Sequence, residues 1–210
     1  MKLLRAAPEA PKGNAEDGRK LFSEINQLQN QQFTICTASI TLVGAYLALV
    51  MPKPPYDTIC GDAKYLAMVS CSSAGAIVVL MLLFLWHNAI AHIVAVISSY
   101  LEVCQLSDWE RDIHSFRRNN SFPSRTRIST YLFLALGGLL FLFAVGVTLE
   151  FRSCGAASAK HADWPEAFQW LTLFFFGYIA LVLAFIRPGG WVTKRTDLIN
   201  RWIELKRGQS

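Results

Sequence analysis

Four long apolar stretches alternate with polar segments along the chain, and none of the four contains Asp, Glu, Lys or Arg. They are residues 33–51, 65–86, 131–149 and 168–186. An uncharged apolar run of about 18 residues or more is long enough to cross the hydrocarbon core of a bilayer as a helix. The pattern therefore predicts an all-α fold, a polytopic membrane protein with four transmembrane helices.

The first two spans are predicted to be parts of longer helices. Leu21, Ile25 and Leu28 share one helical face ahead of the first span, so one helix is expected over 17–51. Residues 65–118 contain no proline, so the second span is expected to continue as a long cytoplasmic helix, to about residue 115. Such a helix is about 75 Å long, more than twice the hydrocarbon thickness of about 30 Å, and must leave the membrane.

Beyond residue 86 the second helix has two different faces, as expected of a helix in an aqueous bundle. The apolar stripe consists of Ile90, Ile93, Ile97, Tyr100, Leu101 and Cys104. The opposite, more polar stripe consists of Asn88, His92, Ala95, Ser99 and Glu102. The first two helices are therefore expected to extend into a cytoplasmic helical bundle.

The remaining segments connect or flank these helices. They are a disordered N-terminal tail, two outer loops and an inner loop, at 1–16, 52–64, 150–167 and 119–130. The tail at 187–210 is predicted to form an amphipathic helix that Thr196 caps. Its apolar face consists of Leu198, Ile199, Trp202, Ile203 and Leu205. Two arrangements stay open, because such a helix can lie on the inner leaflet or pack on the projecting helices.

The placement of positive charge orients the spans. Lys and Arg number five before the first span, then two, five and two in the successive loops, and six after the last span. Loops rich in Lys and Arg stay on the cytoplasmic side, so both termini and the middle loop are expected there. The expected location is the bacterial inner (plasma) membrane.

Composition supports the same class. With 53% hydrophobic and 17% charged residues, the chain differs from an ordinary soluble domain. Its net charge of +5 is attributed to anionic lipid at the inner surface. No nucleic acid is expected, because the basic stretch 117–127 lacks interleaved aromatic residues. The expected partners are the lipid bilayer, further copies of this chain and a soluble cytoplasmic protein.

Two of the five cysteines fall on the predicted outer side. Cys60 lies in the first outer loop and Cys154 in the second. A disulfide between them would join the two helical hairpins on the oxidising side of the membrane. The alternative is two unrelated cysteines, and sequence alone does not decide between these.

The spans contain small hydroxyl side chains in place of ionisable ones. Thr37, Thr41 and Ala45 recur every four residues and therefore share one face of the first helix. Small residues at this spacing let helices approach closely in lipid, which favours a homo-oligomer. The functional alternative is a pore whose lining also includes Ser73.

The histidines do not form a metal or haem site by spacing. His87 and His92 are five residues apart, which turns them to different faces of a helix. Trp86, His87 and Asn88 are interpreted as the point where the second span leaves the membrane on its inner side. His92 is a candidate for gating or partner contact, together with Glu102 and Trp109. No catalytic, cofactor-binding or metal-binding residue is predicted.

The sequence YLEV followed by WER, within residues 97–118, resembles a pattern in small bacterial four-span membrane proteins. That resemblance implies no function. From the residues themselves we expect a non-enzymatic scaffold or membrane effector whose cytoplasmic helices bind a partner or signal. An oligomeric ion-conducting pore is the first alternative, and a membrane redox protein or other enzyme is the second.

Overall fold

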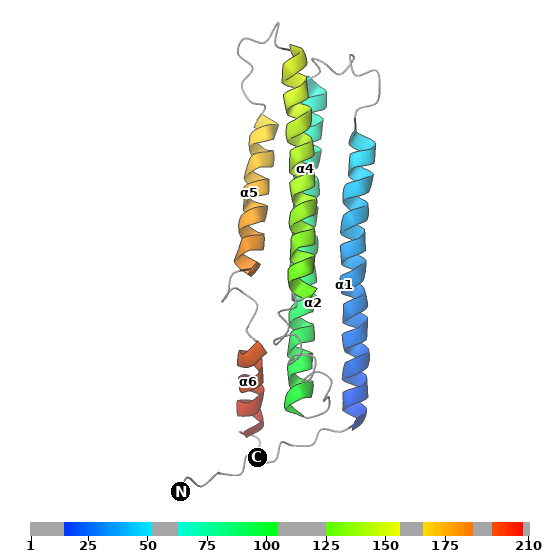
Figure 1. Ribbon diagram of the computed structural model, residues 1–210, viewed down its shortest axis with the longest axis vertical. Helices are drawn as coiled ribbons and strands as arrows, with labels where there is room; N and C mark the ends of the chain where they lie inside the picture. Colours follow the sequence, from blue (N-terminus) through cyan, green and yellow to red (C-terminus); the bar gives the residue numbers. More distant parts are fainter. Residues whose placement is uncertain (1–14, 52–62, 105–124, 156–165, 187–194, 208–210) are drawn as a thin grey trace. The chain divides into compact units, whose positions relative to one another are not determined.

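The computed structural model describes residues 15–51, 63–104, 125–155, 166–186 and 195–207 (Figure 1). Within these ranges the regular elements are all helices: α1 (Ala15–Val50), α2 (Ala63–Val103), α4 (Arg125–Gly155), α5 (Glu166–Ile186) and α6 (Arg195–Arg207). By length and composition, α1, α2, α4 and α5 can each cross a membrane. The prediction of an all-α chain with four candidate membrane spans is thus confirmed for this part of the chain, and it indicates an integral membrane protein.

Two of the helices are much longer than a bilayer span. α1 contains 36 residues and α2 contains 41. At 1.5 Å per residue, α2 is about 60 Å long, twice the hydrocarbon thickness of about 30 Å. Acidic Glu16 and Asp17 in the first turn of α1 suit the positive end of its helix dipole. The stretch of the second predicted helix beyond residue 104 lies outside the described residues.

The chain divides into two compact units. Unit 1 comprises Met1–Gln32, Ala89–Ser124 and Trp191–Ser210, and unit 2 comprises Phe33–Asn88 and Arg125–Gly190. α1 and α2 each pass from one unit into the other without a break. The divisions fall within a few residues of the ends of the predicted spans.

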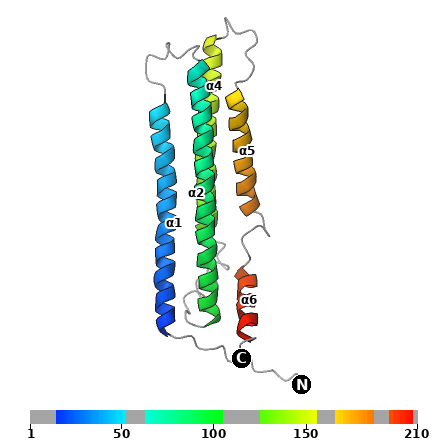
Figure 2. The same cartoon turned by 180° about the vertical axis from the view of Figure 1, so that it is seen from behind.

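Aromatic side chains make the centre of unit 2. Phe84 is fully buried, and its ring meets the rings of Phe133 and Phe185 edge to face, at centroid distances of 5.5 and 5.4 Å. The hydroxyl of buried Tyr178 on α5 donates a hydrogen bond to the carbonyl of Phe133 on α4. These two helices lie side by side (Figures 1 and 2). Edge-to-face contacts add about 0.5–1.5 kcal/mol each beyond the area they bury.

Exposed side chains differ in kind between the two units. Among the described residues, the exposed large hydrophobic side chains belong to unit 2, with the exceptions of Ile93 and Leu205. The exposed side chains of α1 within unit 1 are polar, namely Glu16, Asp17, Arg19, Lys20, Ser23, Glu24, Asn26, Gln27, Asn30 and Gln31. Soluble proteins rarely expose apolar surface of the extent found on unit 2.

The second half of α2 departs from the predicted stripes. Asn88 and Ser99 of the polar stripe are buried, whereas Ile93 of the apolar stripe is 44% exposed. The polar groups bond within their own helix: the Asn88 amide donates to the Phe84 carbonyl at 2.8 Å and the Ser99 hydroxyl to the Val96 carbonyl at 2.7 Å. Because a short polar side chain can be satisfied in this way, its polarity alone does not place it in water.

The remaining helices differ from expectation at their ends. α4 begins six residues before the predicted third span and ends six residues after it. α6 begins at Arg195, one residue before the predicted cap Thr196. Leu205 is 52% exposed and does not share the buried face of α6 that contains Leu198.

Gly137 of α4 allows the close approach of Tyr178. A Cβ atom at position 137 would collide with the Tyr178 ring, which full burial and its hydrogen bond to Phe133 hold in place. We expect Gly137→Ala to lower the free energy of unfolding by about 1–3 kcal/mol, the usual cost of overpacking. Unfolding of the purified chain in mixed micelles measures this change.

The neighbouring glycine gives a matched control. A Cβ at Gly138 would meet no heavy atom within 4 Å. Gly138→Ala should therefore leave stability unchanged or raise it by about 0.5–1 kcal/mol, since alanine loses less backbone entropy in a helix. Equal destabilisation by both substitutions would contradict the assigned contact.

Candidate functional site

A buried histidine joins three helices of unit 2. His87 of α2 is 4% exposed. Its Nε2 lies 2.8 Å from the Ser129 hydroxyl oxygen of α4, and its Nδ1 lies 3.8 Å from the Cys36 sulfur of α1. The contacts connect residues that are 42 and 51 positions apart in sequence. A thiol, an imidazole and a hydroxyl are therefore arranged in series.

The packing around His87 holds its ring in one orientation. The Phe133 ring lies 5.7 Å from the imidazole, centroid to centroid. The adjacent Asn88 is also buried, while Trp86 is 59% exposed. His87 and Asn88 therefore face the protein, and of the residues interpreted as marking a membrane exit only Trp86 has the exposure expected at an interface.

The residues predicted to form a helix-packing or pore-lining face lie in two different environments. Thr37, Thr41 and Ala45 are all exposed on α1. Ser73 is fully buried, with its hydroxyl oxygen 2.6 Å from that of Tyr46. Ser73 therefore belongs to the interior of the protomer, and the other three residues belong to its surface.

Tyr46 is the centre of a second polar cluster in unit 2. Its hydroxyl oxygen lies 3.0 Å from that of Ser72 and donates to the Val69 carbonyl at 3.2 Å. The Tyr46 ring also meets the Phe143 ring edge to face at 6.4 Å. Interhelical hydrogen bonds of this kind contribute about 0.6 kcal/mol on average in membrane proteins. The cluster therefore joins α1 to α2.

The other predicted site residues are placed as follows. His92 is half-buried, and its Nδ1 has no hydrogen-bond partner within the described ranges. Glu102 is half-buried on the same helix. Trp109 and Cys60 lie outside the described residues, as does the side chain of Cys154. The disulfide between Cys60 and Cys154 therefore stays a prediction.

α6 packs on the second half of α2 within unit 1. The Trp202 ring meets the Tyr100 ring edge to face, with centroids 5.1 Å apart. The Lys206 ammonium lies 5.3 Å from the centre of the same Tyr100 ring, a cation–π contact. The described side-chain contacts of α6 are therefore with α2.

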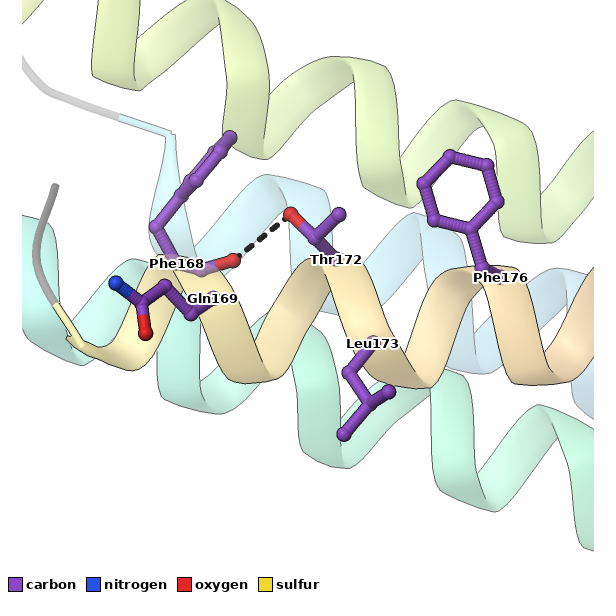
Figure 3. Close-up of a pocket in the computed structure, with 5 residues that line it drawn as sticks. All are labelled: Phe168, Gln169, Thr172, Leu173 and Phe176. Atoms are coloured by element: carbon purple, nitrogen blue, oxygen red, sulfur yellow. Dashed lines mark hydrogen bonds between the residues drawn. The ribbon is translucent and has the colours of Figure 1, made fainter.

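A shallow apolar groove of about 500 Å³ runs along α5 (Figure 3). Among the described residues, its lining side chains belong to α5, and they are Phe168, Gln169, Thr172, Leu173 and Phe176. The Thr172 hydroxyl bonds to the Phe168 carbonyl at 2.9 Å (Figure 3).

Sequence reasoning missed the arrangement of Cys36, His87 and Ser129. A signal existed, since each lies within a few residues of the same end of its predicted span. Among the described residues, no group of three or more His, Cys, Asp or Glu side chains could hold a metal ion. No protein-family model, curated protein or solved structure matches this chain. The chemistry of the cluster therefore has to be argued from its geometry.

The contact between Trp202 and Tyr100 predicts that Trp202 helps to hold α6 against α2. Trp202→Ala removes the edge-to-face pair and should weaken docking of α6 by roughly 0.5–1.5 kcal/mol beyond the lost buried area. Limited trypsin digestion of the detergent-solubilised full chain should then cleave within α6 several-fold faster. Mass spectrometry of the released C-terminal peptides gives the rate.

Leu205→Ala, on the same helix, is the control. Its side chain is 52% exposed and should contribute little to docking. If both variants were cleaved at the rate of the unsubstituted chain, the Trp202 contact would not be what holds α6.

Proposed function

We propose that the chain is a non-enzymatic integral membrane protein that acts as a scaffold or a membrane effector. In this proposal, unit 2 is the membrane part and unit 1 is a cytoplasmic helical bundle that binds a partner or a signal. Both termini are cytoplasmic, and the host membrane is the bacterial inner (plasma) membrane.

The proposal rests on a difference in exposed side chains between the two units. Large exposed apolar side chains, such as Leu142 at 67% and Leu173 at 60%, are typical of unit 2. They suit lipid contact, because lipid tails impose no cost on an exposed apolar side chain. The outer face of α1 within unit 1 is polar and charged, which suits water and a soluble partner.

The distribution of positive charge supports the orientation. The three segments of unit 1 contain five, three and five Lys or Arg residues, whereas the two longer segments of unit 2 contain two and five. A basic segment close to a span favours the cytoplasmic side. It also favours contact with anionic headgroups, by about 1 kcal/mol for each Lys or Arg near the surface.

The exposed small-residue face of α1 supports assembly into a homo-oligomer. Thr37, Thr41 and Ala45 are exposed in the single chain. The Thr37 hydroxyl bonds to the Phe33 carbonyl of its own helix at 3.0 Å, so it does not need a partner to be satisfied in lipid. Small residues on one face allow two helices to approach closely and gain van der Waals contact.

Photo-crosslinking in native membranes tests the partner-binding role. A photoreactive amino acid at Gln27, exposed on α1 in unit 1, should give adducts with a soluble protein. The same amino acid at Leu142, exposed on α4 in unit 2, should give adducts with lipid or with another copy of the chain. Mass spectrometry of the purified adducts identifies both classes.

Two outcomes would count against the proposal. Lipid adducts from Gln27 would place unit 1 in the membrane. Absence of adducts with a different protein from Gln27, together with such adducts from Leu142, would mean that the membrane part and not unit 1 binds the partner.

An oligomeric ion-conducting pore is the second candidate, and the exposed hydroxyl-bearing face of α1 favours it. The lining in this case consists of Thr37 and Thr41, without the buried Ser73. The purified chain should then conduct ions across planar bilayers. Thr41→Val replaces a hydroxyl by a methyl group of similar size and should lower the single-channel conductance.

Thr148→Val is the matched control, because this threonine is 2% exposed and bonds to the Ala144 carbonyl of its own helix at 2.8 Å. It should leave the conductance unchanged. A chain that is monomeric in detergent and gives no current at any applied voltage would eliminate the pore.

A further inference from the structure

Cys36, His87 and Ser129 have the arrangement of an activated nucleophile. Such a site requires a nucleophile within hydrogen-bonding reach of a base and a third group that orients the base. Here the thiol lies 3.8 Å from Nδ1 of His87, and Nε2 of the same ring lies 2.8 Å from the Ser129 hydroxyl oxygen. The imidazole is thereby held between the two side chains.

The hydrogen-bonding pattern shows how a proton can move. In the tautomer that carries its proton on Nε2, His87 donates to the Ser129 oxygen, and Nδ1 is left as an acceptor for the thiol proton. Burial of His87 at 4% exposure keeps the ring from exchanging these partners for water. The thiolate is the reactive form of cysteine, so transfer of this proton generates the nucleophile.

The surroundings of Cys36 indicate which electrophile fits. Cys36 is half-buried, so it lies at the edge of the packed interior and part of the residue is exposed. Phe33 and Ile40, three residues before it and four after it on the same helical face, are 67% and 50% exposed. Together they form an apolar surface along α1 on both sides of the sulfur. An alkyl chain attached at Cys36 can lie along this surface.

We propose that Cys36 is a site of S-acylation that takes its acyl group from a long-chain acyl thioester. The Cys36 sulfur attacks the thioester carbonyl carbon and forms a new carbon–sulfur bond, and the bond between that carbon and the donor sulfur breaks. The thiol proton passes to Nδ1 of His87 and then to the departing thiolate. No oxidant or reductant is consumed, and the products are an acylated Cys36 and a free thiol.

This modification goes beyond the scaffold or effector role and does not depend on it. It adds a covalent lipid to the outer surface of α1, next to the exposed Thr37. His87 acts as the base and Ser129 as the positioning residue.

Labelling of the purified full chain with an alkyne-bearing palmitoyl-coenzyme A tests the proposal. Mass spectrometry of peptides should locate the label on Cys36, in a form that hydroxylamine releases. Cys36→Ser should abolish this label. His87→Gln, which keeps a polar side chain but removes the base, should slow labelling of Cys36 by about 100-fold, at the lower end of what a positioned general base contributes.

A displaced thiol is the matched control. Cys36→Ser combined with Thr37→Cys moves the thiol by one residue on the same helix, to a position exposed in the single chain. Both variants are labelled as the monomeric detergent fraction, so that the proposed contact between copies does not cover position 37. If reachability alone governed the reaction, this variant would be labelled at least as fast as the unsubstituted chain. We expect its rate to be at least tenfold lower.

Label on other cysteines but not on Cys36 would overturn the proposal, and so would equal rates at positions 36 and 37. His87→Gln that labels at the unsubstituted rate would remove the assigned base. Should His87→Gln fail to fold, as judged by gel filtration, the location of the label in the unsubstituted chain and the displaced thiol still decide the matter.

Discussion

The need to satisfy every backbone polar group inside hydrocarbon governs this structure. An α-helix meets that need within one segment, so the apolar stretches of the chain have to be helices. The same requirement extends to hydroxyl side chains. Ser39, Thr148 and Thr172 each donate to the carbonyl four residues earlier, at 2.8, 2.8 and 2.9 Å. Helices that satisfy their own polar groups can present varied side chains to lipid, to each other or to another protein.

The sequence was sufficient to predict the helices and the candidate spans. Uncharged apolar runs define the spans, and the absence of proline through residues 65–104 is enough to extend α2 well beyond a membrane thickness. The faces of α2 were predicted less well, because Asn88 and Ser99 are polar by composition but buried. A pattern of polar and apolar residues shows which side chains are polar. It does not show which of them form hydrogen bonds within their own helix and can therefore be buried.

The arrangement of Cys36, His87 and Ser129 was not predicted from the sequence, for a different reason. Spacing along one helix argues only about a joint site for His87 and His92, whereas a site can also form between helices. To pair Cys36 with His87, one must know at what level each residue lies along its span and how each of the two helices is rotated about its own axis. Sequence periodicity does not supply both. Depth alone narrows the choice, since Cys36, His87 and Ser129 fall near the same end of three spans. Rotation of each helix comes from packing, as in the fit of Tyr178 against Gly137.

α1 and α2 belong to both compact units, and each crosses the boundary without a loop. A loop can absorb a displacement by local changes in backbone torsion, but a hydrogen-bonded helix transmits rotation and translation along its axis. α1 and α2 thus join the two units by unbroken backbone hydrogen bonding, and Cys36 and His87 lie within four residues of the points at which these helices pass from one unit to the other.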